Sequence, residues 1–276
     1  TRSLASGVNS IAVGALPDMV TFTPDGQRVL VANEGTPLTY GPRTSASNVF
    51  PRTFDPAVVD PVGTVSIIDV SNAATRSVIA TVDPQAAGIT RTGTNIRENI
   101  GANFEPEYIA VNAAGTRAYV AIQEANALGV LNLETNAFDT VIGLGSKDFG
   151  RAGNELDPLD NGTIDFVSVN NLRGLYQPDG LATYQAGGQT FIVLANEGDY
   201  REDDGDRSRG SNFGLAAPAN NVRVSNVDST VGGVVFTAGS RSFSIRNENG
   251  GLVYDSGSIL DRAAAAAGIY NDADRS

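Results

Sequence analysis

Residues 17–35 read PDMVTFTPDGQRVLVANEG, and this stretch decides the fold that the sequence predicts. It consists of two runs of alternating apolar residues on either side of a Pro24-Asp25-Gly26 turn, which is the pattern of a β-hairpin. Two related stretches follow, PEYIAVNAAGTRAYVAIQE at residues 106–124 and PDGLATYQAGGQTFIVLANEG at residues 178–198. The chain therefore repeats one hairpin unit three times.

The first two copies continue into a second hairpin, formed by 64–70 with 77–82 and by 127–133 with 138–142. Four antiparallel strands per repeat are typical of a propeller blade. When 36–62, 84–103 and 146–175 are set aside as insertions, the copies lie 42 residues apart. Propeller blades are about 40–45 residues long. We therefore predict an all-β fold, a β-propeller built from four-stranded antiparallel blades.

The blade-like units of this prediction form a single domain over residues 1–276, and they lie near 10–82, 104–145, 176–230 and 231–257. One short helix is expected near the C-terminus, from Ile259 to about Ala267, because an alanine run follows Ser258 and Gly268 ends it. Three blades and part of a fourth cannot close a ring, and an open propeller would expose sheet edges. We expect an incomplete propeller, completed either by further sequence or by a partner chain that supplies the missing blades.

Histidine and cysteine are both absent from the 276 residues. Disulfides, thiolate nucleophiles, Cys/His zinc sites and Ser-His-Asp triads are thereby excluded. Any metal must be held by oxygen ligands, which indicates calcium, or alternatively magnesium.

The chain carries 19 Lys+Arg against 31 Asp+Glu, a net charge of −12. An acidic surface repels phosphate backbones and anionic lipid, so we expect neither nucleic acid nor a membrane surface as a partner. The apolar runs are strand-sized, far below the ~20 residues that a transmembrane helix needs. The N-terminus shows no signal peptide, so the chain is either intracellular or exported with its signal removed.

The long insertions all belong to one face of the predicted propeller. Segments 36–62 and 197–221 follow second strands, whereas 84–103 and 146–175 precede first strands. In a blade these two kinds of connection emerge on the same side. Loops elaborated on one side of a rigid scaffold are where function concentrates.

An acid follows proline at the start of each repeat, namely Asp18, Glu107 and Asp179. Because inner strands begin there, these carboxylates are expected to ring the mouth of a central channel. Their partners near the ends of the second strands are Glu34, Glu124 and Glu197. Converging carboxylates suit a hard cation, although acids after proline also cap turns by binding nearby backbone amides.

Residues 199–206 contain five acids in eight positions, among them Asp199 and Asp203. Such a loop either binds cations or stays extended in solvent by self-repulsion. The predicted metal ligands are therefore Asp18, Glu34, Glu107, Asp179, Glu197, Asp199 and Asp203.

Lys147 is the only lysine, and with Arg201 it could meet a phosphate in a calcium-lined channel. The alternative is a lysine on the surface of a loop. Arg241 is expected to pair with an acid.

Four stretches resemble the choice-of-anchor I family, which includes the mesenchyme-specific cell-surface glycoproteins, and the repeat is similar to surface-layer-type propeller repeats. The stretches are VGALPD (13–18) with NEG (33–35), EPEYIAV (105–111), YQPD (176–179) with ANEGD (195–199), and GSRSFSI (239–245). The resemblance covers nearly the whole chain. It differs in the long Pro/Thr/Ser-rich loop 36–62 and in ending where relatives continue through further blades.

The resemblance implies an extracellular or surface-attached propeller of about seven blades, some of whose relatives are linked to phosphatases. We predict a secreted or surface-attached protein that binds calcium on one acidic face and serves as a cell-envelope or matrix binding module. The alternative is a calcium-dependent phosphomonoesterase of alkaline phosphatase or phytase type, so whether the chain is an enzyme stays open. A purely structural envelope component would bind no ligand beyond structural ions.

Overall fold

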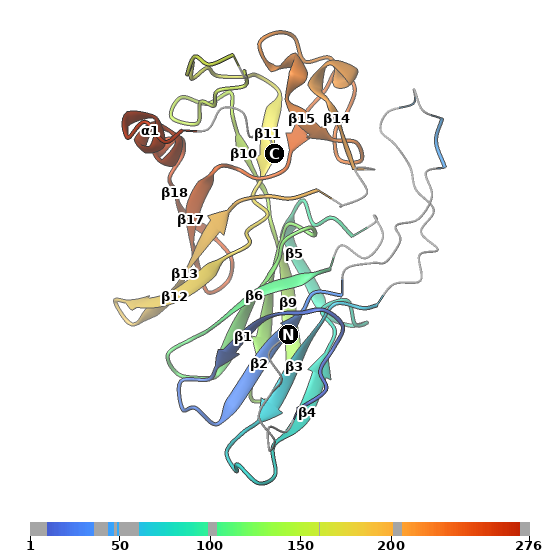
Figure 1. Cartoon of the computed structure of the whole chain (residues 1–276), viewed down its shortest axis with the longest axis vertical. Coiled ribbons are helices and arrows are strands. Elements are labelled where there is room, and N and C mark those ends of the chain that lie inside the picture. The colour runs from blue at the N-terminus through green and yellow to red at the C-terminus, as the bar shows by residue number, and fades with distance from the viewer. Residues whose placement is uncertain are drawn as a thin grey trace.

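A computed structural model of the chain describes residues 10–35, 44–46, 49, 61–98, 104–159, 161–200 and 206–270 (Figure 1). In these residues the fold is all-β, with mostly antiparallel sheets and one short α-helix, α1 (Ile259–Ala266). This helix confirms the one expected from the alanine run. No helix within the described ranges is both long and apolar enough to span a bilayer.

The first sheet is an antiparallel meander whose strands follow one another in chain order. Its strands are β1 (Pro17–Phe22), β2 (Arg28–Asn33), β3 (Thr64–Asp69) and β4 (Ser77–Val82). The β1–β2 turn forms where the sequence predicts it. Asp25 accepts hydrogen bonds from the Thr23 hydroxyl at 2.6 Å and the Gln27 amide at 3.0 Å, and Gly26 takes a φ of 68°.

The second sheet repeats this meander and adds a fifth strand at its outer edge. The meander consists of β6 (Pro106–Val111), β7 (Arg117–Ile122), β8 (Ala127–Asn132) and β9 (Ala137–Leu144). The added strand, β5 (Thr90–Thr94), lies within the predicted insertion 84–103 and pairs parallel to β9.

The third sheet combines two segments that are far apart in the sequence. It contains β12 (Leu181–Ala186), β13 (Gln189–Asn196), β17 (Ser242–Asn247) and β18 (Leu252–Asp255), in that order. The pairing of β13 with β17 corrects the predicted units 176–230 and 231–257. The last hairpin completes the third sheet and does not begin a fourth, because β17 supplies the neighbour that β13 would otherwise lack.

The remaining strands form a smaller subdomain from the connections around the third sheet. A three-stranded sheet pairs β10 (Ser146–Asp148) with β11 (Leu172–Leu175), and β11 runs parallel to β16 (Val235–Thr237). A ribbon joins β14 (Arg207–Arg209) to β15 (Arg223–Ser225), with two short 3-10 helices, Gly210–Phe213 and Ala219–Asn221, between them. Phe149, Leu172, Phe213, Val224 and Val235 form the core of this subdomain.

The three main sheets stack face to face, with the second sheet in the middle. One core joins the first and second sheets through residues such as Leu30, Ile67 and Val120. Another core joins the second and third sheets through Tyr119, Leu128 and Ile192. Tyr119 and Val120 are neighbours in β7 and both are fully buried, so the middle sheet is covered on both faces.

A buried ion-pair network ties the segment before the second sheet to the subdomain. The guanidinium of Arg97, 1% exposed, donates to Asp206, which is fully buried, and to Asp228 at 2.8 Å. Its third contact is the backbone carbonyl of Glu124, at 2.9 Å. Residues that are more than 100 positions apart in the sequence are thereby held together.

Replacing Arg97 with methionine is expected to lower the free energy of unfolding by about 3–5 kcal/mol, because Asp206 would remain buried without its counter-ion. Urea denaturation of the purified chain measures this loss. The matched control is Arg151→Met. Arg151 has a side chain that is 78% exposed and lies 3.8 Å from Asp148, so the expected loss is about 0–1 kcal/mol. Equal losses for both variants would contradict a stabilising role for the network.

Candidate functional site

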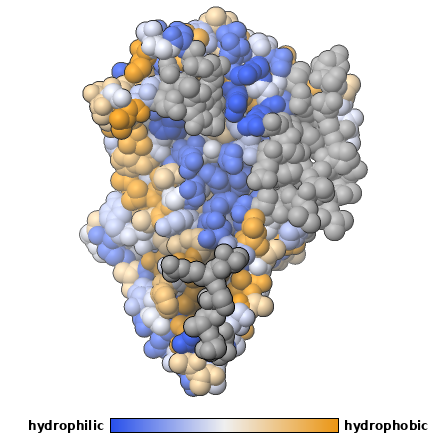
Figure 2. Space-filling model, viewed as in Figure 1, coloured by the Kyte–Doolittle hydropathy of each residue, from blue (hydrophilic) through white to orange (hydrophobic). Residues whose placement is uncertain are grey.

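A cavity of about 840 Å³ opens where strand ends of the three main sheets meet, and its lining is strongly acidic. Its carboxylate residues are Glu34, Glu105, Glu107, Glu124, Asp179, Glu197, Asp199 and Asp261. Figure 2 shows hydrophilic residues gathered across the middle of one face of the molecule, beside a hydrophobic area. Among the described residues, Arg241 is the only basic side chain in the lining.

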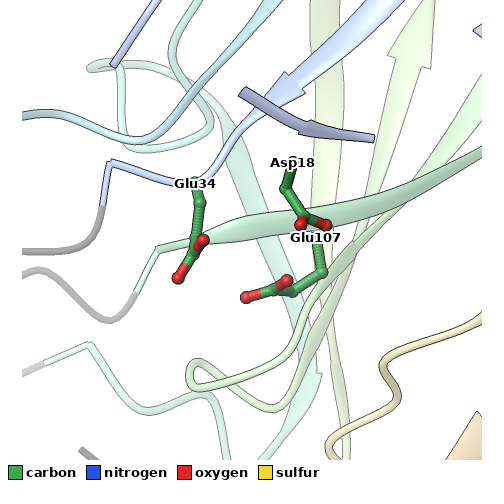
Figure 3. Close-up of side chains that lie close together, drawn as sticks. All are labelled: Asp18, Glu34 and Glu107. Carbon is green, nitrogen blue, oxygen red and sulfur yellow. The ribbon is translucent and has the colours of Figure 1, made fainter. Parts of the chain in front are cut away.

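Asp18, Glu34 and Glu107 come together at the mouth of this cavity (Figure 3). Each offers one carboxylate oxygen, and these three oxygens all lie within 4.8 Å of one another. The strands that carry them belong to two different sheets, so the cluster exists only in the folded chain. The predicted convergence of these three acids is therefore present in the structure.

Irregular strand pairing places the acids at the starts of the repeats. In β1 the register shifts between Pro17 and Met19, and in β6 it shifts between Pro106 and Ile109. Such bulges leave one residue outside the regular ladder and change the direction of its side chain. Asp18 lies in the first of these irregular stretches, and Glu107 lies in the second beside Tyr108, so a similar local irregularity occurs at the acids of both repeats.

The third sheet contributes Asp179, Glu197 and Asp199 to the opposite part of the lining. Asp179 lies two residues before β12, Glu197 directly follows β13, and Asp199 lies two residues further along the chain. Asp179 and Glu197 correspond in the third repeat to Asp18 and Glu34 in the first. All six predicted metal ligands within the described ranges therefore lie at the cavity or its mouth, whereas Asp203 lies outside those ranges.

Two further acids, Glu105 and Glu124, form the inner wall. Glu124 was among the acids predicted to converge at the ends of the second strands, whereas Glu105 was not predicted. Glu105 and Glu124 are only 2% and 6% exposed. Glu124 stands in the short turn between β7 and β8, at the end of a second strand, and this position was a usable signal. Glu105 precedes Pro106, and the only sequence feature that marked it was its place in 105–111, one of the stretches that carry the family resemblance.

Comparison with known proteins assigns the chain to a family. The profile of the choice-of-anchor I domain matches residues 1–276. The chain belongs to the choice-of-anchor I family. Membership indicates a module associated with the cell surface.

No curated protein matches this choice-of-anchor I chain. Among solved structures it is similar to Kuenenia stuttgartiensis hydrazine synthase, with 14% identity and a TM-score of 0.30 over 92% of this chain and 52% of that chain. A protein of unknown function from Desulfotomaculum acetoxidans matches at 12% identity and a TM-score of 0.29, over 88% of this chain and 72% of that chain. The choice-of-anchor I chain thus spans about half the length of the hydrazine synthase chain.

Like charges and burial make the carboxylates of this cavity hard to ionise. Burial, followed by the charges of Glu124, Glu34, Asp18 and Asp179, raises the pKa of Glu107 to about 9. Burial is also the largest cause of the raised pKa of Glu124, followed by the charge of Glu105. The pKa of Glu197 is raised by burial and by Asp179 and Asp199. Without a cation, the folded chain therefore retains a proton on Glu107 at neutral pH.

The wall facing the acids is formed by α1 and the residues after it. Leu260, Ala264, Ile269 and Tyr270 line it with mostly apolar surface. Arg241 donates to Asp261 through Nε at 2.9 Å and through Nη2 at 3.0 Å, which confirms the expected pairing with an acid.

Lys147 is placed away from the cavity lining, in β10, and is 3% exposed. Its ammonium donates to the carbonyl oxygens of Ser240 at 2.6 Å and Gly257 at 2.9 Å. It therefore joins the segments that carry Ser240 and Gly257. This role differs from both sequence-based alternatives, a phosphate contact and a lysine on the surface of a loop. Arg201, the other predicted phosphate contact, lies outside the described residues.

The raised pKa of Glu107 predicts how the calcium-free protein responds to pH. Between about pH 5 and 9 the folded chain keeps a proton on Glu107 that the unfolded chain has lost, so the free energy of unfolding falls as pH rises. Glu107→Gln cannot titrate, and it is expected to reduce this slope. Urea unfolding in EDTA at several pH values measures it. Identical slopes for the two proteins would contradict the assignment.

Proposed function

We propose that this chain is a calcium-binding, surface-associated module whose cation site is formed by Asp18, Glu34 and Glu107. The observation that carries the proposal is the approach of their three carboxylate oxygens to within 4.8 Å of one another. Two like charges about 5 Å apart repel by roughly 3 kcal/mol at an effective dielectric constant of 20. A dication between the carboxylates would replace this repulsion with attraction.

The donor set favours calcium over other cations. The chain contains no histidine or cysteine, which disfavours zinc and other metals that prefer nitrogen or sulfur ligands. Calcium accepts six to eight oxygen ligands in irregular geometry, whereas magnesium demands a near-ideal octahedron. Carboxylates from separate strands around an open cavity suit the less demanding ion, with Asp179 and Glu197 as further ligands across the cavity.

We further propose that the three main sheets are blades of a propeller. Support comes from their sequential antiparallel strands and from the face-to-face stacking of each sheet on the next. The outer faces are apolar and exposed: Val20 and Phe22 of the first sheet are 63% and 62% exposed, and Tyr184 and Tyr254 lie on the third. Further blades of the same kind, including blades from a partner chain, would continue the stack over these faces.

The acidic, loop-rich side would face a partner in the cell envelope or matrix, bound through calcium. The alternative function, a calcium-dependent phosphomonoesterase, needs a basic group directed at phosphate. Among the described lining residues that group is Arg241, and Asp261 already holds two of its nitrogens. The arrangement therefore favours cation binding over phosphate transfer.

Calcium is expected to stabilise the chain, because it would bind the folded state and not the unfolded one. At 100 times the dissociation constant the gain is about 2.7 kcal/mol, or roughly 5–10 °C in melting temperature for a chain of this size. Thermal unfolding in calcium, magnesium and EDTA measures this gain. Asp18→Asn removes one predicted ligand and should lose most of it.

Glu134→Gln is the matched control, because it also removes one negative charge. Glu134 is exposed and follows β8 at the end remote from Glu124. This variant should retain the full calcium effect. A melting temperature that is the same in calcium and EDTA would refute the proposed function. Calcium-dependent turnover of a generic phosphomonoester would instead favour the phosphomonoesterase.

A further inference from the structure

The inner wall of the acidic cavity carries a second group of carboxylates, separate from the cluster at the mouth. Glu105 and Glu124 flank β6 and β7 on the cavity side, and both are buried. Asp199, from the third sheet, lines the same cavity. None of these three residues belongs to the Asp18, Glu34 and Glu107 cluster.

Glu124 is the most informative member of this group. Its side chain is buried, yet its Oε2 atom has no hydrogen-bond partner among the residues that the structure describes. A buried carboxylate oxygen that lacks a partner loses the hydration it had in the unfolded chain and gains nothing in return. Proteins rarely retain such a group unless a bound water, ion or ligand completes it.

The buried cation that contacts the Glu124 turn has carboxylate partners elsewhere. Arg97 donates to the backbone carbonyl of Glu124. Its other nitrogens donate to Asp206 and Asp228, which take up its charge. The guanidinium thus fixes the position of the Glu124 turn through its backbone.

The buried side chains of Asn126 and Gln177 hold Asp199 in a similar way. The side chain of Asn126, near the Glu124 turn, accepts a hydrogen bond from the backbone N–H of Gln177 at 3.0 Å. The side chain of Gln177 in turn donates to the backbone carbonyl of Asp199 at 2.9 Å. Both inner acids are therefore positioned through their carbonyl groups by buried side chains, an arrangement that fixes a binding site before its ligand arrives.

We infer that Glu124 and Glu105, with Asp199 across the cavity, bind a second divalent cation behind the one at the mouth. This inference rests on the proposed function, since both ions share one cavity. The inner ion would be held by oxygen ligands and shielded from water, and calcium is the probe of choice. The protein would then bind two calcium ions per chain, each held mainly by its own set of acids.

Calcium bound per chain, measured by equilibrium dialysis at saturating calcium, tests the inference. The wild-type chain is expected to bind two ions. Glu124→Gln should bind one, Asp18→Asn should bind the other one, and the double variant should bind none. Glu134→Gln, with the same loss of charge on an exposed residue, should still bind two.

The melting temperature shows whether the variants fold. It also distinguishes a cation-binding role of Glu124 from a role in packing alone. Glu124→Gln removes a buried ionisable carboxyl group without changing the side-chain shape, so its melting temperature in EDTA should equal or exceed that of the wild type. In calcium it should fall below the wild type. If Glu124→Gln does not fold, Asp199→Asn provides the second test, with at least a tenfold loss of affinity expected for one ion only.

The outcomes distinguish the two proposals. One ion per wild-type chain, lost in Asp18→Asn but kept in Glu124→Gln, would overturn the inner site and leave the proposed function standing. One ion lost only in Glu124→Gln would support the inner site and overturn the site at the mouth. No bound ion would overturn both.

Discussion

The burial of the middle sheet on both faces is the constraint on which the rest of the molecule depends. Because β7 presents Tyr119 to one neighbouring sheet and Val120 to the other, the first and third sheets pack on opposite faces of the second. The starts of the first strands and the ends of the second strands then meet around one cavity. The position of the acids is thus a consequence of hydrophobic packing, reinforced by the bulges in β1 and β6.

This packing brings like charges together in the cavity, whereas outside the cavity it pairs opposite charges. Beneath the Glu124 turn, Arg97 offsets the charges of Asp206 and Asp228. Within the cavity, Arg241 is already paired with Asp261, so the remaining acids repel one another and their pKa values rise. A cation supplied from outside would relieve this repulsion. The family to which the chain belongs is associated with the cell surface, where free calcium is plentiful, and this setting fits the proposal.

Sequence reasoning predicted what depends on local patterns. Alternating apolar residues and turns such as Pro24-Asp25-Gly26 identified the strands. The acids after proline, with their partners at the ends of the second strands, identified Glu34, Glu107, Glu124, Asp179 and Glu197 of the cavity lining. The pairing of β13 with β17 could not be predicted, because it joins segments separated by an insertion with strands of its own. Glu105 and the burial of Lys147 escaped for the same reason: their surroundings come from segments remote in the sequence.

The central claim is that the carboxylates meet in order to hold a cation. Its most direct test is a crystal structure of the calcium-bound protein, measured at long wavelength so that calcium scatters anomalously. The account predicts an anomalous peak about 2.3–2.6 Å from carboxylate oxygens of Asp18, Glu34 and Glu107. A cavity without such a peak, in crystals grown with abundant calcium, would contradict it.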